Sequence, residues 1–133
     1  PHTIEEKKLP FNQAPAGMPG VETSLPLMLN HSQTSDIDIK DIVKWMCENP
    51  ATLYKIKNKG FLKEDFDADI TIVDMNKEKV VDGKNMQSKC GWSAFDGKNL
   101  KGWPVITIVN GNIVFENEQI NDEIKGKKVL FDE

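Results

Sequence analysis

Two hydrophobic periods divide this chain of 133 residues. Between residues 23 and 58, apolar side chains recur at intervals of three and four positions, which is the spacing of one face of an α-helix. From residue 68 onward, apolar and polar residues alternate, as they do along β-strands with one buried face. The pattern therefore predicts a helical first half and an antiparallel β second half, with the change close to Lys59-Gly60.

The first twenty residues are predicted to form a loop. They hold four of the seven prolines and two glycines, which disfavours a regular helix or strand. Long loops inside compact proteins are usually either functional or disordered, and the apolar residues spaced along this one favour an ordered active-site loop. A short buried helix is expected next, over residues 23–29, with Thr23 or Ser24 as its N-cap and Pro26 in its first turn.

Two further helices are expected before the period changes. The first follows a cap at Ser35-Asp36. Its apolar face consists of Ile39, Ile42, Val43 and Met46. We expect it to stop at Asn49, because Asn49-Pro50 supplies the cap and the first-turn proline of a new short helix.

The second half is predicted to be an antiparallel sheet. Its strands are expected at residues 68–74, 105–109 and 113–115. The last two are joined by Asn110-Gly111-Asn112, a strong hairpin signal. Residues 79–81 are expected to add a short pairing strand, residues 85–102 show no period, and residues 120–133 are interpreted as a tail that docks on the rest.

Composition narrows the class of protein. With 17 basic and 21 acidic side chains, the net charge is −4 and the lysines are scattered, so no nucleic-acid footprint is expected. No apolar run approaches the ~20 residues of a membrane span, and no leader pattern opens the chain. We therefore expect a soluble, cytoplasmic protein with no membrane partner. The spacing of Cys47 and Cys90 fits neither a metal site nor a disulfide framework, which favours reduced thiols.

Three segments carry a resemblance to a known family. Pro1-His2 matches the end of an Asp-His-Ala-Pro-His run, and residues 14–23 match the Pro-x-Gly loop and Gly-x-Glu-Thr helix start that follow it. Residues 88–97 are close to the segment Ser-Lys-Cys/Ala-x-x-Ser-Pro-Phe-x-Gly, with Ala94 in place of the usual proline. In these segments the chain resembles the dihydroorotases, in the cyclic amidohydrolase branch of the amidohydrolase superfamily.

The β half is similar to the composite β-sandwich of that superfamily. Four segments carry this likeness: residues 49–51, 60–62, 67–74 and 107–111. The resemblance implies an α/β fold class. Residues 1–58 would be the C-terminal segment of a (β/α)8 hydrolase barrel, with its last active-site loop and closing helices, and residues 59–133 would be part of a small β-sandwich domain. A complete barrel needs ~250 residues, which this chain does not have.

The resemblance also implies an activity. Dihydroorotases are zinc-dependent hydrolases that interconvert N-carbamoyl-L-aspartate and (S)-dihydroorotate in de novo pyrimidine biosynthesis. The one or two zinc ions and the catalytic residues are expected upstream of Pro1, so that no metal ligand and no catalytic residue lies in this chain, which alone should be inactive. Its expected partners are the N-terminal part of the same enzyme and the small-molecule substrate. The oligomeric state and the nature of the terminus at Pro1 are left open.

Two alternatives stand beside this interpretation. The chain could belong to another cyclic amidohydrolase, of the allantoinase or hydantoinase kind, since most of its motifs are shared across the superfamily. It could instead come from a non-catalytic homologue that serves as a scaffold. Activity on hydantoin or allantoin separates the first alternative from a dihydroorotase, and the residues before Pro1 separate the second.

Three residues are candidates for substrate binding. By the resemblance, His2 would contact the substrate carboxylate, and Ala16 and Gly17 would offer backbone groups to the pyrimidine ring. An imidazole can donate to a carboxylate, and a small residue followed by glycine lets the main chain approach a ligand closely. The competing interpretations are a terminal histidine without a role and an ordinary Pro-Ala-Gly turn.

Other conspicuous side chains are assigned structural roles. Glu22 is expected to meet the positive end of a helix dipole. Burial is the expected state of the tryptophans Trp45, Trp92 and Trp103. The carboxylates Asp67, Asp69 and Asp74 are expected to protect a strand edge, with metal binding as the less favoured alternative.

Overall fold

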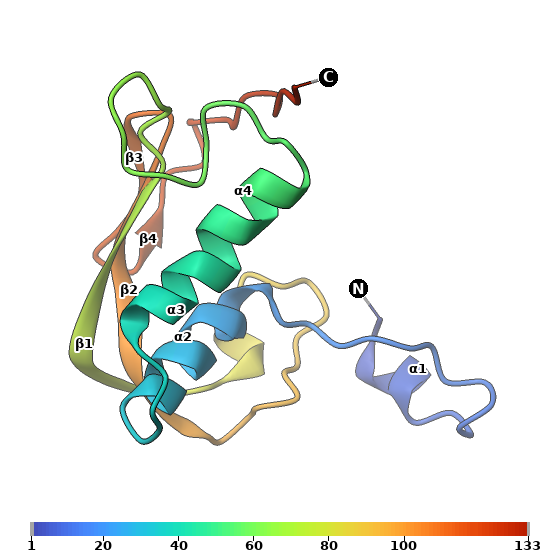
Figure 1. Ribbon diagram of the computed structural model, residues 1–133. Helices are drawn as coiled ribbons and strands as arrows, with labels where there is room; N and C mark the ends of the chain where they lie inside the picture. Colours follow the sequence, from blue (N-terminus) through green and yellow to red (C-terminus); the bar gives the residue numbers. More distant parts are fainter. Residues whose placement is uncertain (1, 133) are drawn as a thin grey trace.

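The computed structural model describes residues 2–132, in which helices lie against one face of an antiparallel sheet (Figure 1). The helical elements are α1 (Ile4–Lys7), α2 (Val21–Ser32), α3 (Ile39–Val43), the π-helical segment η1 (Lys44–Glu48) and α4 (Asn49–Leu53). The second half holds β1 (Ile70–Val80), the short 3-10 segment η2 (Gly83–Asn85), β2 (Asn99–Val109), β3 (Asn112–Glu116) and β4 (Gln119–Ile120). The predicted change from helical to β structure is confirmed.

The sheet has four strands in the order β1-β2-β3-β4, and each neighbouring pair is antiparallel. β1 and β2 form a long ribbon, because β1 continues past residue 74 to Val80. The two strands predicted at 68–74 and 79–81 are therefore one strand with a register shift between Asp74 and Glu78. At this shift the Asp74 carboxylate accepts a hydrogen bond from the Asn76 N–H, so the side chain satisfies a backbone group that pairing leaves free.

The predicted hairpin between β2 and β3 is confirmed. Asn110 and Gly111 both have positive φ, 49° and 80°, as a type I′ turn requires. A second tight turn at Asn117 and Glu118, with φ of 52° and 62°, leads into β4, whose last residue is the first of the predicted tail. It lacks the glycine that usually signals such a turn. The tail docks as expected: the Lys57 N–H donates to the Leu130 carbonyl at 2.9 Å.

At the far end of the ribbon, backbone hydrogen bonds join the two ends of a loop that contributes residues to the candidate site. The Val81 N–H donates to the Lys98 carbonyl at 2.9 Å, and the Gly97 N–H donates to the Val81 carbonyl at 3.0 Å. Residues 82–96, which include η2, project from this closure. The irregular segment predicted at 85–102 is thus shorter than expected, because β2 begins at Asn99, where backbone pairing with β1 takes over.

The second predicted helix does not stop at Asn49. α3, η1 and α4 run on without a break from Ile39 to Leu53, and Asn49 has helical angles, φ −63° and ψ −46°. Its N–H donates to the Lys44 carbonyl, five residues back, which is the bond of a π turn. A proline inside a helix removes one hydrogen bond and crowds the carbonyl four residues earlier, and the wider π turn gives Pro50 that room. The N-cap is Asp38, whose carboxylate accepts from the Lys40 N–H at 2.8 Å, and not Ser35-Asp36.

The helix predicted over residues 23–29 is longer at both ends. The N–H groups of Thr23 and Ser24 donate to the Gly20 carbonyl, so α2 begins at Val21. Pro26 therefore lies in the second turn, where its ring is buried, and not in the first. His31, which lies beyond the predicted range, belongs to the last turn of α2.

The loop predicted over the first twenty residues contains one turn of helix, α1. Thr3 and Glu6 form a reciprocal capping box around its start: the Glu6 N–H donates to the Thr3 hydroxyl at 3.2 Å, and the Thr3 N–H donates to the Glu6 carboxylate at 2.6 Å. α1 and the segment after it project from the body of the molecule (Figure 1).

A small core fixes α2 on the sheet. Its buried apolar residues are Leu29, Ile42, Ala51, Val81 and Leu100. Gly102 of β2 lies under Leu29, and a Cβ added there would lie 2.8 Å from the Leu29 Cβ, which explains a glycine at this strand position. The Lys101 N–H donates to the Asn30 side chain at 2.9 Å and completes the attachment of α2 to β2.

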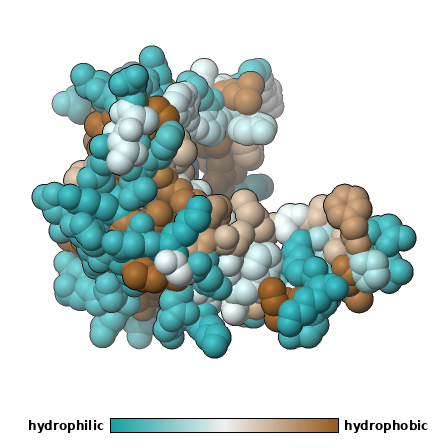
Figure 2. All heavy atoms as spheres, turned by 90° about the horizontal axis from the view of Figure 1, so that it is seen from below, coloured by the Kyte–Doolittle hydropathy of each residue, from teal (hydrophilic) through white to brown (hydrophobic). Residues whose placement is uncertain are grey.

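Many large apolar side chains remain exposed. Phe11, Val21 and Leu62 are 101%, 93% and 84% exposed, and Trp45, expected to be buried, is 47% exposed. Of the apolar helix face predicted between Ile39 and Met46, only Ile42 is buried. Apolar residues emerge on the body and on the projecting N-terminal segment in Figure 2. A surface of this kind is typical of segments that pack against other protein.

Candidate functional site

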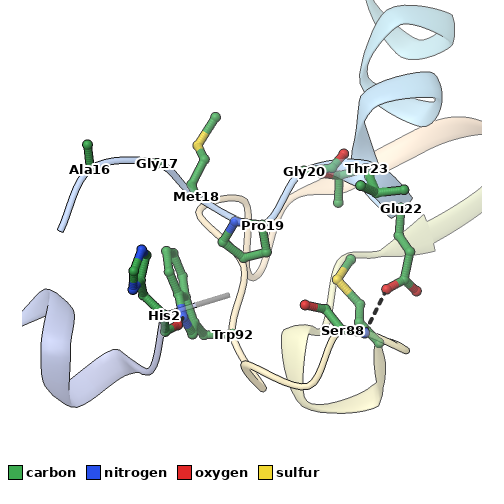
Figure 3. A pocket seen from close by; sticks show the side chains of 12 residues that line it. His2, Ala16, Gly17, Met18, Pro19, Gly20, Glu22, Thr23, Ser88 and Trp92 are labelled. Atoms are coloured by element: carbon green, nitrogen blue, oxygen red, sulfur yellow. Dashed lines mark hydrogen bonds between the residues drawn. The ribbon is translucent and has the colours of Figure 1, made fainter.

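Three segments distant in sequence enclose a hollow of about 320 Å³ (Figure 3). It is lined by His2, residues 16–23, Met86, Ser88 and Trp92. The three residues singled out in the sequence for substrate binding, His2, Ala16 and Gly17, thus lie around one hollow. Pro1, the other half of the His2 motif, lies outside the described residues.

The loop between α1 and α2 forms one wall. Gly17 has a φ of 86°, in the left-handed region that favours glycine, and a Cβ added to it would meet no protein atom within 4 Å. The glycine is therefore required by the backbone turn and not by crowding within the chain. Lys7 of α1 donates a hydrogen bond from its ammonium group to the Pro15 carbonyl, which ties the loop to α1.

Glu22 connects this wall to the opposite one. It lies in the first turn of α2, and its carboxylate accepts the backbone N–H groups of Gln87 at 3.1 Å and Ser88 at 3.0 Å; the bond to Ser88 is drawn in Figure 3. Bonds from two backbone donors to one carboxylate are charge-assisted and hold the loop at residues 87 and 88 against the helix start. Its position in the first turn also fits the structural role expected from the sequence.

Trp92 connects the same loop to the N-terminal segment. Its indole N–H donates to the His2 carbonyl at 2.8 Å, and the Lys7 ammonium lies 6.0 Å from its ring centroid. In Figure 3 the His2 imidazole lies beside the indole. The indole is partly buried, and its polar atom has a partner, as is usual for tryptophans at wet boundaries.

The His2 imidazole is accessible to a ligand. Its Nδ1 lies 3.8 Å from the Glu6 carboxylate, and its side chain is 45% exposed. The hydrogen bond from the Thr3 N–H lowers the pKa of Glu6, and the neighbouring His2 lowers it further. An exposed imidazole at the edge of the hollow can donate a hydrogen bond to an anionic ligand.

Both cysteines are free. The hydroxyl of Ser88 lies 2.9 Å from the Cys90 sulfur, and this hydrogen bond lowers the pKa of the Cys90 thiol. Burial raises the pKa of Cys47. Neither thiol lines the hollow.

The described residues do not supply a metal centre. No group of three or more histidine, cysteine, aspartate or glutamate side chains is placed to hold an ion within residues 2–132. Lys59 occupies the carboxylates near β1: it pairs with Asp67 at 2.9 Å and with Asp69, and the hydrogen bond to Asp69 raises the pKa of Lys59. Asp69 also accepts from the Asn110 N–H at 2.7 Å, which fixes the β2–β3 turn.

Within residues 2–132, no helix is long and apolar enough to span a membrane.

Sequence reasoning did not assign roles to Glu22 or Trp92 at the site. Their partners lie 65 to 90 residues away in the chain, so no local pattern announces them. The signals were the motifs at residues 14–23 and 88–97, which mark the two segments but not the contacts between them.

Comparison with known proteins places these segments in a family. The model of the amidohydrolase family matches residues 17–114. A dihydroorotase from Pyrococcus furiosus is 38% identical over 130 residues, covering 98% of this chain and 30% of that protein. A dihydroorotase from Acetivibrio thermocellus is 45% identical over 115 residues, 86% of this chain and 27% of that protein. The resemblance to dihydroorotases stated from the motifs is confirmed.

Solved structures give a consistent result. An L-hydantoinase (dihydropyrimidinase) from Arthrobacter aurescens superposes with a TM-score of 0.82 at 35% identity, over 88% of this chain and 27% of that one. The chain therefore spans about 30% of the length of the curated relatives it matches, and a similar share of this structure.

Proposed function

Since the chain belongs to the amidohydrolase family, we propose that it forms the C-terminal part of a dihydroorotase and supplies the substrate-binding loop of that enzyme. Residues 1–58 would close the hydrolase barrel, and residues 59–133 would contribute to a composite β-sandwich. The observation that carries the proposal is the gathering of His2, Ala16 and Gly17 around one hollow. Identities of 38% and 45% to proteins named dihydroorotase support it.

In this proposal the hollow receives the carboxylate-bearing pyrimidine ring. Its volume of about 320 Å³ lies within the range of small-molecule sites. The His2 imidazole would donate to the carboxylate of dihydroorotate or carbamoyl-aspartate. The left-handed turn at Gly17 would bring the main chain of Ala16 and Gly17 against the ring, where the absence of a side chain leaves room for the ligand.

Zinc would be held by the remaining part of the enzyme. The described residues offer no donor set for it. When bound, zinc would supply an activated hydroxide and polarise the amide carbonyl. What this chain contributes is binding and orientation of the substrate in the cytoplasmic enzyme, with the N-terminal part as its partner.

A hydantoinase-like activity is the second candidate. The superposition on the Arthrobacter aurescens L-hydantoinase favours it, because 35% identity approaches the identity to the dihydroorotases. The two activities differ in the carboxylate on the ring. Since hydantoin has no such group, His2 would have no anionic partner there.

Turnover by the full-length enzyme, in which this chain is joined to its N-terminal part, tests the proposal. We expect zinc-dependent hydrolysis of dihydroorotate and little or none of hydantoin or allantoin. Preference for hydantoin or allantoin would replace the proposal with the second candidate. Failure to hydrolyse any of the three at full zinc occupancy would favour a non-catalytic scaffold.

A further inference from the structure

We propose that Trp92 and Glu22 are positioning residues that together hold His2 at the substrate-binding hollow. This inference rests on the proposed function, since it gives His2 the task of meeting the ligand. It assigns a role to two side chains that have no part in the proposed contacts with the ligand's carboxylate and ring. Neither needs to react with the substrate.

The first contact in this arrangement is the hydrogen bond from the Trp92 indole N–H to the His2 carbonyl. α1 and its flanks project from the body (Figure 1), and the capping box and the Lys7 bond to Pro15 are internal to the N-terminal twenty residues. Within the part of the chain that the structure describes, the indole bond to the His2 carbonyl is the one hydrogen bond between residues 2–9 and any residue beyond 15. Among the described residues, this indole is therefore the hydrogen-bonding link from the body of the chain to His2.

The second contact attaches the loop that carries Trp92 to the start of α2. This loop leaves the β1–β2 ribbon at Val81. The Glu22 carboxylate holds it by two backbone N–H groups four and five residues before the indole. Glu22 is itself rigidly placed, because α2 is fixed on β2 through Leu29 and the Asn30 side chain. The sheet, α2, the loop and His2 thus form one connected chain of contacts.

If Trp92 only filled space, removing its indole N–H would have a different effect on His2. The indole lines the hollow, so a phenylalanine ring could fill much of the same volume, yet it has no N–H to donate. If packing alone mattered, Trp92→Phe would leave His2 in place. If the N–H matters, the same change would release the His2 main chain and weaken ligand binding without touching the reacting atoms.

The test compares Trp92→Phe with Trp103→Phe in the full-length enzyme. Trp103 is a matched control, because its indole N–H also donates to a backbone carbonyl, that of Leu100, at the same 2.8 Å, and it does not line the hollow. We expect Trp92→Phe to raise KM for dihydroorotate about three- to tenfold, the factor that one net hydrogen bond is worth, with kcat within about twofold of the parent. Trp103→Phe should leave KM unchanged.

Glu22→Gln tests whether the Glu22 carboxylate holds the loop that carries Trp92. The amide replaces one accepting oxygen with an NH2 group, so one of the two backbone bonds is lost. We expect KM to rise as it does for Trp92→Phe. Glu78→Gln is its control, because the Glu78 carboxylate accepts from the Asn99 side chain at 3.1 Å in the sheet, away from the hollow.

Hydrogen exchange of the backbone amides of residues 3–9 separates this inference from the proposed function. In Trp92→Phe their exchange should be faster than in the parent and in Trp103→Phe, whether or not the enzyme turns over dihydroorotate. Unchanged exchange overturns the inference, even if the parent is an active dihydroorotase. Unchanged KM with faster exchange also overturns it, because His2 would then move without consequence for the ligand. A parent that hydrolyses no cyclic amide would defeat the proposed function alone, and exchange would still decide whether Trp92 and Glu22 hold His2.

Discussion

Replacing Gly17 with valine tests whether the loop backbone meets a ligand. Gly17 has a φ of 86°, and an L residue in the left-handed region costs about 1–2 kcal/mol, with a β-branched side chain near the upper end. A Cβ at this position would contact no atom of residues 2–132 within 4 Å, so crowding of the Cβ within this part of the protein adds nothing to that cost. Any further loss in the presence of substrate must therefore come from the ligand.

Gly97→Val provides the matched control. Gly97 has a φ of 79°, its Cβ position is equally open, and it does not line the hollow. Both variants should lose a similar free energy of unfolding, about 1–2 kcal/mol by urea titration of the full-length enzyme. Only Gly17→Val should raise KM, by about tenfold or more, which corresponds to about 1.4 kcal/mol of lost binding. His31→Ala, at the exposed end of α2, should leave KM unchanged.

The outcome that refutes this reasoning is equal kinetics. If Gly17→Val and Gly97→Val both fold, carry full zinc and share the KM of the parent, the loop is only a turn. The assignment of Ala16 and Gly17 to the substrate would then be wrong. A rise in KM for Gly97→Val as well would mean that backbone strain, and not contact with the ligand, controls binding.

Three further outcomes are expected. The isolated chain should bind no stoichiometric zinc and hydrolyse no dihydroorotate, as measured by metal analysis and turnover; one bound zinc with activity would place the chemistry within these residues. His2→Ala in the full-length enzyme should weaken binding of the carboxylate ligand by about 1.5–3 kcal/mol at unchanged zinc content, whereas zinc loss would make His2 a metal ligand. Gly102→Ala should destabilise the protein by about 1–3 kcal/mol more than Gly111→Ala, because only the former places a Cβ 2.8 Å from Leu29; equal urea midpoints would contradict the packing of α2 on β2.

The sequence anticipated those elements whose signals are local. Asn110-Gly111 predicted the β2–β3 turn because two residues with positive φ suffice to make it. Ala16 and Gly17 were chosen by the resemblance to dihydroorotases, and both line the hollow. Residues 79–81 were predicted to pair, but their continuity with residues 68–74 was not, since the partner strand supplies the hydrogen bonds of β1 regardless of the side-chain pattern.

In the helices, local sequence signals and contacts made only in the folded chain favour different structures. Pro50 is a strong first-turn signal, yet the helix continues through it by widening into a π turn. Trp45 lies on an exposed face of its helix, although the size of tryptophan favours burial. Glu22 was seen as a helix-start residue, and its bonds to Gln87 and Ser88 depend on a contact that only the folded chain creates.

The closure at Val81 has a consequence for how this site can change. The strand ends hold the two ends of the 82–96 loop together, through backbone bonds that involve no particular side chain. Lengthening such a loop costs little, about 0.6 kcal/mol for each doubling, because its ends are already joined. One wall of the hollow can therefore be rebuilt by insertion or replacement while the ribbon and α2 keep their places. Transplanting this loop between relatives would therefore reshape the hollow without rebuilding the scaffold.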